Sequence, residues 1–597
     1  FNSLVPLKTE FSPPALSPLQ PPLSFLRRYA LGILLLLTLL GAALRFWNLG
    51  TKPPWTDEFA TWVFSLGNDF TGIPGGEMLT VAQLLAPLQF NQPGQWGRVI
   101  DLLVNQDNHP PLYFLLAHLW QGLFPQDYQA LNITVGRSLA ALAGTLTIPL
   151  SYALARWLWT PSLALALALL TALSPYGIFI SQEARHYTLA ALWITLSLGF
   201  CLKASQYFRQ GKPLPRRLVL AWVLVNALAL STHFFTGLFI LAEFLGLAGW
   251  RRSDIRYQIS DISERLLVIP RFFKLGRFKG VLFRSRLLPV LLGTLTAALV
   301  WGWVISQRDY GHGMTQWMAL ERRNFLNLLG PPIQLLAAWV TMFTLLPVES
   351  PNLILAIAAG LGMLAYVIFL LPRLKRGLDL ALTGHWQSEA RLLLWITGSL
   401  LALYFAVTYG AGMDITRGAR YSFNFFPLLI FLAALALVSL AQTLAKPGRL
   451  WALVILMGVA SAVTVTHNLG YQKYYRPELF LAQVAQVSPP GARPLIVTTR
   501  QSLVQTGEMM GLALEARRRF PQLDLRFALI PQTRPQSPEA AAQLNQLLES
   551  QDQSIDLWLV NFHAPADLPQ CQPLPNVGPA VNGYGYRRFA CPAPSFD

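Results

Sequence analysis

Long apolar runs recur along this sequence, and most are close to the length of a helix that crosses a bilayer. About 20 apolar residues in a helix span the roughly 30 Å of hydrocarbon in a membrane. The pattern therefore predicts a polytopic α-helical membrane protein with about eleven transmembrane helices. The predicted ranges are 29–47, 133–155, 162–180, 188–205, 218–231, 234–250, 287–306, 352–371, 392–410, 421–441 and 450–466.

Two shorter apolar stretches are interpreted differently. Residues 112–124 follow Pro110 and Pro111, and residues 333–346 follow Pro331 and Pro332. Counting either one alone as a crossing would place most of the basic segments after it on the outer side. Both are therefore expected to be helices that lie in or dip into the outer interface.

After residue 466 the composition becomes that of a soluble protein. Strands are expected at 494–499, 524–530 and 555–560, with helices at 501–519 and 538–550 between them. This alternation predicts a small C-terminal α/β domain with three layers. No glycine-rich phosphate loop opens either helix, so no nucleotide site is expected. The predicted units are residues 1–28, a cytoplasmic N-terminal segment; 29–470, the transmembrane domain with a large first outer loop at 48–132; and 471–597, an extracytoplasmic domain.

The formal charge of +17 indicates how the chain is oriented in the membrane rather than which molecule it binds. With the first helix running outward, the segments on the cytoplasmic side hold 25 Lys and Arg, and the outer loops hold 8. This difference is the positive-inside pattern of an integral inner membrane protein with its C-terminal domain outside. No nucleic acid partner is expected. The basic segment 251–286 is either an amphipathic stretch on anionic lipid or a solvated loop.

Three cysteines are too few for a zinc ribbon or a disulfide scaffold. Cys201 lies in an apolar run and is expected to be a packing residue. Cys571 and Cys591 both lie in the C-terminal domain, where an oxidising compartment would allow them to pair. Whether they pair is left open.

The first outer loop carries two adjacent carboxylates, Asp57 and Glu58, in the segment RFWNLGTKPPWTDEFATW. Trp47, Trp55 and Trp62 are expected to hold this segment near the bilayer surface. Carboxylates are costly to keep close to lipid unless they are used, and adjacent helical residues do not share a face. One is therefore expected to face a reaction and the other to support it. The alternative is two solvated acids, with Asp57 capping a helix that begins at Glu58.

Polar residues also gather at four other outer turns. His109 precedes the helix of DNHPPLYFLLAHLW, where a structural histidine is the alternative to a functional one. SPYGIFISQEARHYTLAAL places several polar residues in a short turn, either as an anion or sugar site or as caps of two helices. STHFF and GMDITRGARYSFNFFP add a histidine and two arginines, and arginine suits phosphate oxygens. An interfacial arginine that reaches for water is the competing interpretation. The residues concerned are Gln182, Glu183, Arg185, His186, Tyr187, His233, Arg417, Arg420 and Tyr421.

These five motifs, in this order and with this topology, resemble the C-type (GT-C) membrane glycosyltransferases. Among them, the bacterial proteins similar to protein O-mannosyltransferases and to lipid A aminoarabinose transferases are the nearest in pattern. The resemblance covers residues 29–470. The C-terminal domain carries no recognised signature, although related enzymes often end in an external soluble domain.

The resemblance implies inverting transfer of a sugar from a polyprenyl-phosphate donor to a hydroxyl or amine of a protein, lipid or polysaccharide acceptor. Asp57 matches the catalytic carboxylate of the first outer loop and would act as general base, with Glu58 beside it. The acceptor side would be formed by His109, Glu183, Tyr187 and His233. The donor phosphate would be held by Arg185, His186, Arg417, Arg420 and Tyr421.

Glu183 departs from the Asp found in some relatives, which leaves its role open. A divalent cation such as Mg²⁺ or Mn²⁺ between Glu183 and the phosphate is also left open. We expect no cofactor and no metal to be obligatory.

Two other function classes compete with this interpretation. A secondary transporter or lipid flippase would carry charges at the membrane midplane and helices broken in both halves, whereas Glu243 is the main charge within a predicted span. A non-catalytic membrane scaffold would tolerate Asp57→Asn. An uptake assay in vesicles and a sugar-transfer assay separate these classes from a glycosyltransferase.

Overall fold

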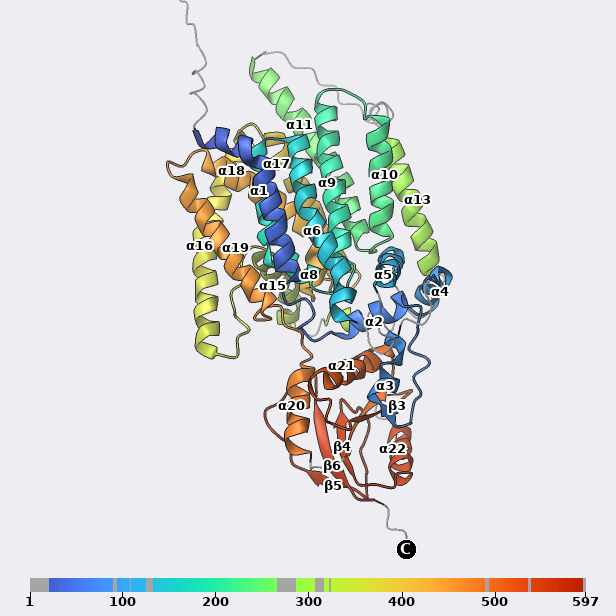
Figure 1. Cartoon of the computed structure of the whole chain (residues 1–597). Coiled ribbons are helices and arrows are strands. Elements are labelled where there is room, and N and C mark those ends of the chain that lie inside the picture. Colours follow the sequence, from blue (N-terminus) through green and yellow to red (C-terminus); the bar gives the residue numbers. More distant parts are fainter. Residues whose placement is uncertain are drawn as a thin grey trace, which may run out of the picture.

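The computed structural model describes residues 21–89, 94–107, 109–124, 132–265, 286–306, 316–321, 324–488, 493–534 and 538–593. Figure 1 shows two parts, a large bundle of helices and a smaller α/β part that lies at one end of it. The bundle is formed by α1 (Pro21–Phe46), α6 (Ile133–Leu158), α7 (Pro161–Leu173), α8 (Pro175–Ser181), α9 (Tyr187–Arg209), α10 (Arg216–Leu230), α11 (Thr236–Arg265), α13 (Leu287–Ser306), α15 (Phe325–Thr341), α16 (Leu353–Thr383), α17 (Gln387–Phe405), α18 (Phe426–Ala441) and α19 (Pro447–Thr466). The expected segment 1–28 lies largely outside the described residues, as do residues 266–285 of the basic segment 251–286.

Seven helices of the described chain are long and apolar enough to cross a membrane, or eight if the bent pair α7 and α8 forms one span. Each of the eleven predicted ranges coincides with a helix or with this bent pair. Three of them, α10, α11 and α18, are not among the seven or eight. The chain is thus a mostly helical protein with several candidate membrane spans, and the number eleven stays a prediction.

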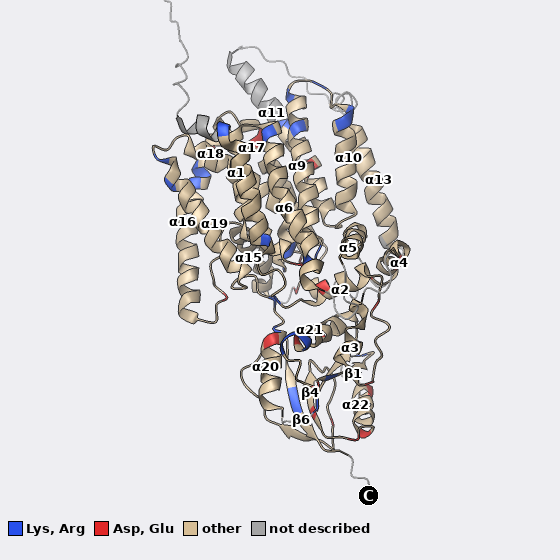
Figure 2. Ribbon diagram, viewed as in Figure 1, with Lys and Arg blue, Asp and Glu red and all other residues tan. Residues whose placement is uncertain are grey.

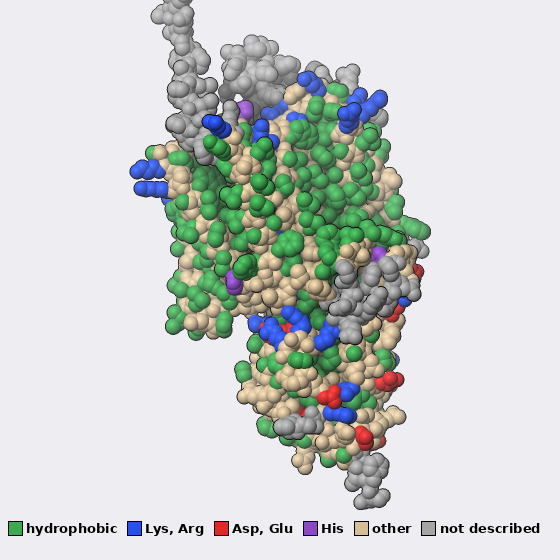
Figure 3. All heavy atoms as spheres, in the orientation of Figure 1, with side chains coloured by type: hydrophobic (Ala, Val, Ile, Leu, Met, Phe, Trp, Pro, Cys, Tyr) green, Lys and Arg blue, Asp and Glu red, His purple; other side chains and the backbone are tan. Residues whose placement is uncertain are grey.

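The helical bundle has the surface of a membrane protein. Figure 3 shows that hydrophobic side chains cover most of its visible flank, whereas the α/β part is mixed. Several large apolar side chains on α1 and α16 are exposed, among them Leu31, Leu36, Leu353 and Ile354. Figure 2 shows that Lys and Arg gather mainly at the end of the bundle farthest from the sheet. An apolar flank with basic residues at one end is the pattern expected of helices embedded in lipid.

The two short apolar stretches are both helical. Helix α5 (Leu112–Gly122) begins directly after Pro111, as the proline pair predicted. Helix α15 begins earlier than expected, at Phe325, and contains both Pro331 and Pro332. The expectation that this proline pair precedes the helix is therefore wrong.

A break between α7 and α8 positions the turn that carries the polar motif QEARHY. Pro175 has no amide hydrogen to continue α7, and the Ser174 side chain accepts from the amide of Gly177 to start α8 at an angle of 55°. Arg45 of α1, which is 1% exposed, donates to the freed carbonyls of Thr171 and Ala172 at 2.9 and 3.2 Å. A buried cation thus satisfies the end of a broken helix.

The α/β part is built on one six-stranded sheet with the order β1-β3-β2-β4-β6-β5, in which β1 is Leu79–Thr80. Strands β2 (Arg493–Arg500), β3 (Arg526–Pro531) and β4 (Ile555–Val560) are parallel, while β5 (Gln572–Leu574) and β6 (Tyr586–Cys591) extend the sheet antiparallel. Helices α20 (Pro477–Val487), α21 (Leu503–Arg519) and α22 (Glu539–Glu549) complete this part. The three predicted strands and two predicted helices coincide with β2, α21, β3, α22 and β4.

Alternate residues of the central strands face two different cores, which gives the predicted three layers. Leu495 and Val497 pack with α22. Ile496 packs with α20 and α21 on the opposite face. Side chains point to opposite faces of a strand in alternation, so a fully apolar strand is expected when both faces are covered.

The first outer loop belongs to the same folded body as the C-terminal segment. Its elements are α2 (Thr56–Ser65), β1 (Leu79–Thr80), α3 (Val81–Leu84), η1 (Ala86–Leu88), α4 (Trp96–Gln106) and α5. Strand β1 pairs antiparallel with β3 and forms an edge of the sheet. Apolar side chains of α2 and α4 pack in one continuous core with those of α20 and α21. Elements of the first loop therefore share a sheet and a core with residues of the predicted unit 471–597.

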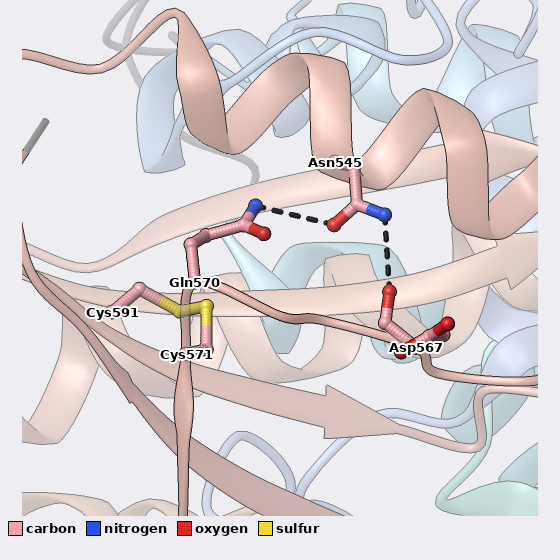
Figure 4. The surroundings of a disulfide bond; sticks show 5 residues. All are labelled: Asn545, Asp567, Gln570, Cys571 and Cys591. Atoms are coloured by element: carbon pink, nitrogen blue, oxygen red, sulfur yellow. Dashed lines mark hydrogen bonds between the residues drawn. A yellow bond between two sulfur atoms is a disulfide. The ribbon is translucent and has the colours of Figure 1, made fainter.

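Cys571 and Cys591 form a disulfide at the end of β6 (Figure 4). The segment before Cys571 is also tied to α22, because Asn545 donates to the Asp567 carbonyl at 3.0 Å and accepts from Gln570 at 3.2 Å. Cys201 is free and buried, as expected of a packing residue.

Replacing both Cys571 and Cys591 by Ser is expected to destabilise the protein by about 2–4 kcal/mol, because the bond closes a loop in the unfolded chain. Thermal unfolding of the purified protein measures the loss. Thiol titration of the denatured wild type should find one free thiol without reductant, and finding three would contradict the pairing.

Candidate functional site

Helix α2 places Asp57 at the centre of the polar cluster. The helix begins at Thr56 after Pro53 and Pro54, and its N-cap is Trp55, which makes no side-chain cap hydrogen bond. Asp57 therefore lies inside the first turn, and the alternative that it caps a helix starting at Glu58 is wrong. Its side chain is 33% exposed, so it is open to a ligand.

Glu58 points the other way, into the protein, and its side chain is fully buried. Both carboxylate oxygens accept hydrogen bonds from Arg137 of α6, at 2.7 and 2.8 Å, and one also accepts from the amide of Ala184 at 2.8 Å. Burial alone would raise the pKa of Glu58, but Arg137 holds the pKa below its ordinary value. The two adjacent acids thus face opposite ways, and Glu58 ties α2 to α6 and to the turn after α8.

Arg137 also fixes the segment that leads into α2. It is 1% exposed and donates to the carbonyls of Leu49 and Lys52 at 2.9 and 3.0 Å. Sequence reasoning missed this residue. The available signal was a single ionisable residue within the apolar range 133–155, since buried charges in such ranges are rarely without a role.

Arg185 faces Asp57 from the turn between α8 and α9. Its guanidinium lies 3.7 Å from the Asp57 carboxylate and donates to the Asp57 carbonyl at 3.0 Å and to Thr61 at 2.9 Å. Burial alone would lower the pKa of Arg185, but Tyr187 and Asp57 raise it. A buried, permanently charged guanidinium therefore lies beside the exposed carboxylate.

His109 connects Arg185 to a second carboxylate. Its Nδ1 lies 2.8 Å from Asp107, and its Nε2 lies 3.0 Å from the Arg185 guanidinium. Because arginine can only donate, Nε2 must accept, so the ring proton resides on Nδ1 and is donated to Asp107. His109 thereby links the Arg185 guanidinium to the Asp107 carboxylate.

His186 and His233 form an aromatic layer behind His109. The ring centroids of His186 lie 5.0 Å from His109 and 4.6 Å from His233, and Tyr187 packs at 4.7 Å. Burial lowers the pKa of both His186 and His233 well below the usual value, and the charge of Arg185 adds to the effect. Both rings are therefore neutral near pH 7.

The lowered pKa values of His186 and His233 predict that the stability of the protein depends on pH. The unfolded chain takes up protons at these histidines near pH 6.5 and the folded chain does not, so the free energy of unfolding falls as pH drops below that value. As pH falls, the free energy of unfolding of the wild type should decrease by up to about 1.4 kcal/mol per pH unit more than that of His186→Phe. Unfolding midpoints at pH 7.5 and 5.5 measure this, and parallel pH profiles of the two proteins would contradict it.

Trp55, close to Asp57 in the chain, contacts two cations. The Arg420 guanidinium lies 3.9 Å from the ring centroid of Trp55, and the Lys473 ammonium lies 4.5 Å from it. Lys473 also forms an ion pair with Glu183. Sequence reasoning missed Lys473, which lies in the short connection between α19 and α20, where no pattern marks it. Trp62, expected near lipid, is 1% exposed and packs in the protein core instead.

Arg417 and Tyr421 form the outer edge of the cluster. Tyr421 stacks on Trp317, with ring centroids 6.0 Å apart, and packs against Tyr187. Arg417 is exposed, donates to the Trp317 carbonyl and lies 3.8 Å from Asp414. Through Trp317 and Tyr421, Arg417 therefore lies at the periphery of the contact network around Asp57.

A small pocket opens on the Lys473 side of this network. Its polar lining is mainly basic, and it consists of Lys52, Arg137, Gln182, Glu183, Asn468, Lys473 and Arg476, with Phe179, Tyr471 and Tyr475 among the aromatic side chains. Burial, with Arg137 adding to it, lowers the pKa of Lys52 to about 7. Such a lining suits an anion. In the part of the chain that the structure describes, no three His, Cys, Asp or Glu side chains are grouped so that they could hold a metal ion.

No family model matches this sequence. No curated protein matches it either. Among solved structures, the chain is similar to ArnT from Cupriavidus metallidurans bound to undecaprenyl phosphate, with 14% identity and a TM-score of 0.46 over 94% of this chain and 98% of that one. In the apo state of ArnT the identity is 13% and the TM-score 0.48, with the same coverage. The oligosaccharyltransferase of Archaeoglobus fulgidus in its apo form matches with 13% identity and a TM-score of 0.44 over 94% of this chain and 75% of that one.

Proposed function

We propose that this chain is a membrane glycosyltransferase that moves a sugar from a polyprenyl-phosphate donor to an acceptor hydroxyl or amine on the outer face of the membrane. The observation that carries the proposal is the surroundings of Asp57. A partly exposed carboxylate lies beside the buried guanidinium of Arg185, and Arg420 and Lys473 both lie over the ring of the neighbouring Trp55.

This arrangement suits the demands of the reaction. The acceptor oxygen or nitrogen attacks the anomeric carbon, the bond from that carbon to the phosphate oxygen breaks, and the acceptor proton goes to a carboxylate oxygen of Asp57. The phosphate leaves as an anion and needs little protonation, but its charge must be balanced. Arg185 and Arg420 are fixed by their surroundings and would stabilise that charge as it develops.

The remaining residues divide between support and binding. Glu58 and His109 position α2 and Arg185 through the contacts described above. Tyr187, His233 and Glu183 are proposed to shape the acceptor side, and Arg417 and Tyr421 the rim of the phosphate site. His186, which is buried behind His109, is proposed to support the phosphate site from inside the protein. The basic pocket beside Glu183 extends the area in which an anionic headgroup could bind.

The proposed topology follows from where charges and the disulfide lie. Basic residues gather mainly at the bundle end opposite the sheet (Figure 2), which we assign to the cytoplasmic side. The α/β part carries the Cys571–Cys591 disulfide and is assigned to the extracytoplasmic side. With about eleven spans in an inner membrane, Asp57 lies at the outer surface, where a polyprenyl phosphate presents its sugar.

Purified protein incubated with a panel of polyprenyl-phosphate hexoses and aminopentoses tests the proposal. With membranes as acceptor source, we expect release of free polyprenyl phosphate from at least one donor, detected by mass spectrometry. A parallel reaction in EDTA tests the expectation that no metal is obligatory. Release from no donor, or equal release by Asp57→Asn, would contradict the proposed function.

A further inference from the structure

The helix that carries Asp57 is packed against the C-terminal segment. Side chains of α2, including Phe59 and Val63, share one buried core with Met509 and Met510 of α21. These residues are more than 400 positions apart in the sequence. The position of α2 is therefore set from two sides, by Arg137 and Arg185 of the membrane bundle and by α21.

The closest approach between the two helices is at Gly507 of α21 and Thr56 of α2. A Cβ at position 507 would lie 2.8 Å from the Thr56 Cγ2 atom, closer than carbon atoms pack, and 3.5 Å from the Thr56 Cα atom. One turn later, a Cβ at Gly511 would lie 3.7 Å from Phe59, which is ordinary van der Waals contact. Of these two glycines, only Gly507 is required by the distance between the helices.

Four further contacts connect this region and the turn that carries Arg185 to residues after α19. Arg518 of α21 donates to the Gly50 carbonyl at 2.9 Å, before α2 begins. Arg500 donates to the Ile73 carbonyl at 2.7 Å, and the Gly76 amide donates to the Leu529 carbonyl at 2.9 Å, both after α2 ends. Lys473 pairs with Glu183 in the turn that carries Arg185.

We propose that the C-terminal segment forms a fixed side of the catalytic site, and that Gly507 is a positioning residue for Asp57 because it lets α21 approach α2 closely. This inference rests on the proposed function. The contact between α21 and the first turn of α2 sets the separation of the Asp57 carboxylate from the Arg185 guanidinium, which is 3.7 Å. A displacement of α2 by a few tenths of an ångström changes where the acceptor proton is received, and reaction rates are sensitive to such errors.

The test compares Gly507→Ala with Gly511→Ala in the full chain. Both changes place alanine in α21 and raise its helix propensity alike, so a difference between them reports the contact with α2. We expect Gly507→Ala to lower kcat by about 10-fold or more with little change in KM. Gly511→Ala should stay within about twofold of the wild type, because its new contact is an ordinary one.

Thr56→Ser provides the rescue. Serine lacks the Cγ2 methyl that a Cβ at 507 would meet, and the next nearest atoms of residue 56 would then lie 3.5 and 3.6 Å away. The double variant Gly507→Ala with Thr56→Ser should regain most of the lost kcat, while Thr56→Ser alone stays near the wild type. A merely general loss of stability would not be repaired by removing this one methyl group.

Hydrogen exchange of residues 56–65 gives a readout that needs no substrate. Gly507→Ala should speed exchange in α2, and Gly511→Ala should not. Adding Thr56→Ser to Gly507→Ala should return exchange in α2 to the wild-type rate. Equal exchange in the two alanine variants would overturn the inference.

If Asp57→Asn is inactive while Gly507→Ala and Gly511→Ala have the same kcat, the inference fails and the proposed function stands. If Asp57→Asn is fully active, the proposed function fails. Faster exchange of α2 in Gly507→Ala would then show that α21 packs against α2 without a catalytic role.

Discussion

Replacing Asp57 by Asn is expected to lower kcat for sugar transfer by about 10²–10⁴-fold, the usual contribution of a general base. Asparagine keeps the size and hydrogen-bonding shape of the side chain but cannot accept the acceptor proton. Asp57 is one-third exposed and is not the N-cap of α2, so the fold should survive the change. The unfolding midpoint should therefore stay close to that of the wild type.

The assay is release of polyprenyl phosphate under saturating donor. Asp101→Asn is a matched control, because Asp101 is an exposed aspartate of the same outer loop that contacts Asn105 on its own helix. That variant should keep full activity. An Asp57→Asn protein that retains more than about one-tenth of the wild-type kcat would show that the base lies elsewhere.

Removing Arg137 is expected to have the largest effect on stability. Arg137→Met leaves the buried Glu58 carboxylate without its partner, and breaking a buried ion pair in this way costs about 3–5 kcal/mol. The carbonyls of Leu49 and Lys52 also lose their donor. Thermal unfolding in detergent should show a much lower midpoint, with the activity lost together with the fold of the segment before α2.

The double variant Arg137→Met with Glu58→Gln separates charge from shape. Neutralising both partners removes the unpaired charge, and replacing a whole buried pair is far less costly than removing one member. The double variant should therefore be more stable than Arg137→Met alone. If it is equally unstable, the backbone contacts of Arg137 rather than the Glu58 pair hold this region. The roles of the two adjacent acids are thus distinguished by experiment. Asp57→Asn should lose activity, whereas Arg137→Met, which leaves Glu58 without its ion-pair partner, should lose stability.

The helices and the parallel strands could be predicted because their patterns are local. Eleven apolar ranges and the alternation of strands and helices after residue 493 need no knowledge of distant contacts. Strand β1 has only two residues and exists because β3 lies beside it. No sequence pattern within the first loop indicates that partner. The start of α15 was misplaced because prolines are rarely found inside a helix.

The candidate site was predicted where polar residues cluster at predicted helix ends. Asp57, His109, Arg185 and Arg420 all come from such ends, and the structure brings them into one network. Lys473 and Arg137 were missed for different reasons. Lys473 lies in a connection without pattern, and Arg137 is within an apolar range, where its partner Glu58 can be identified only from the folded structure.

The position of Asp57 is tested most directly by chemical labelling. An Asp57→Cys protein in oriented membrane vesicles is treated with a membrane-impermeant maleimide, with and without polyprenyl phosphate. Cys201 is buried and Cys571 is paired with Cys591, so the wild type supplies the background. We predict labelling from the extracytoplasmic side that polyprenyl phosphate suppresses. Labelling only from the cytoplasmic side, or labelling that polyprenyl phosphate leaves unchanged, would contradict the proposed site.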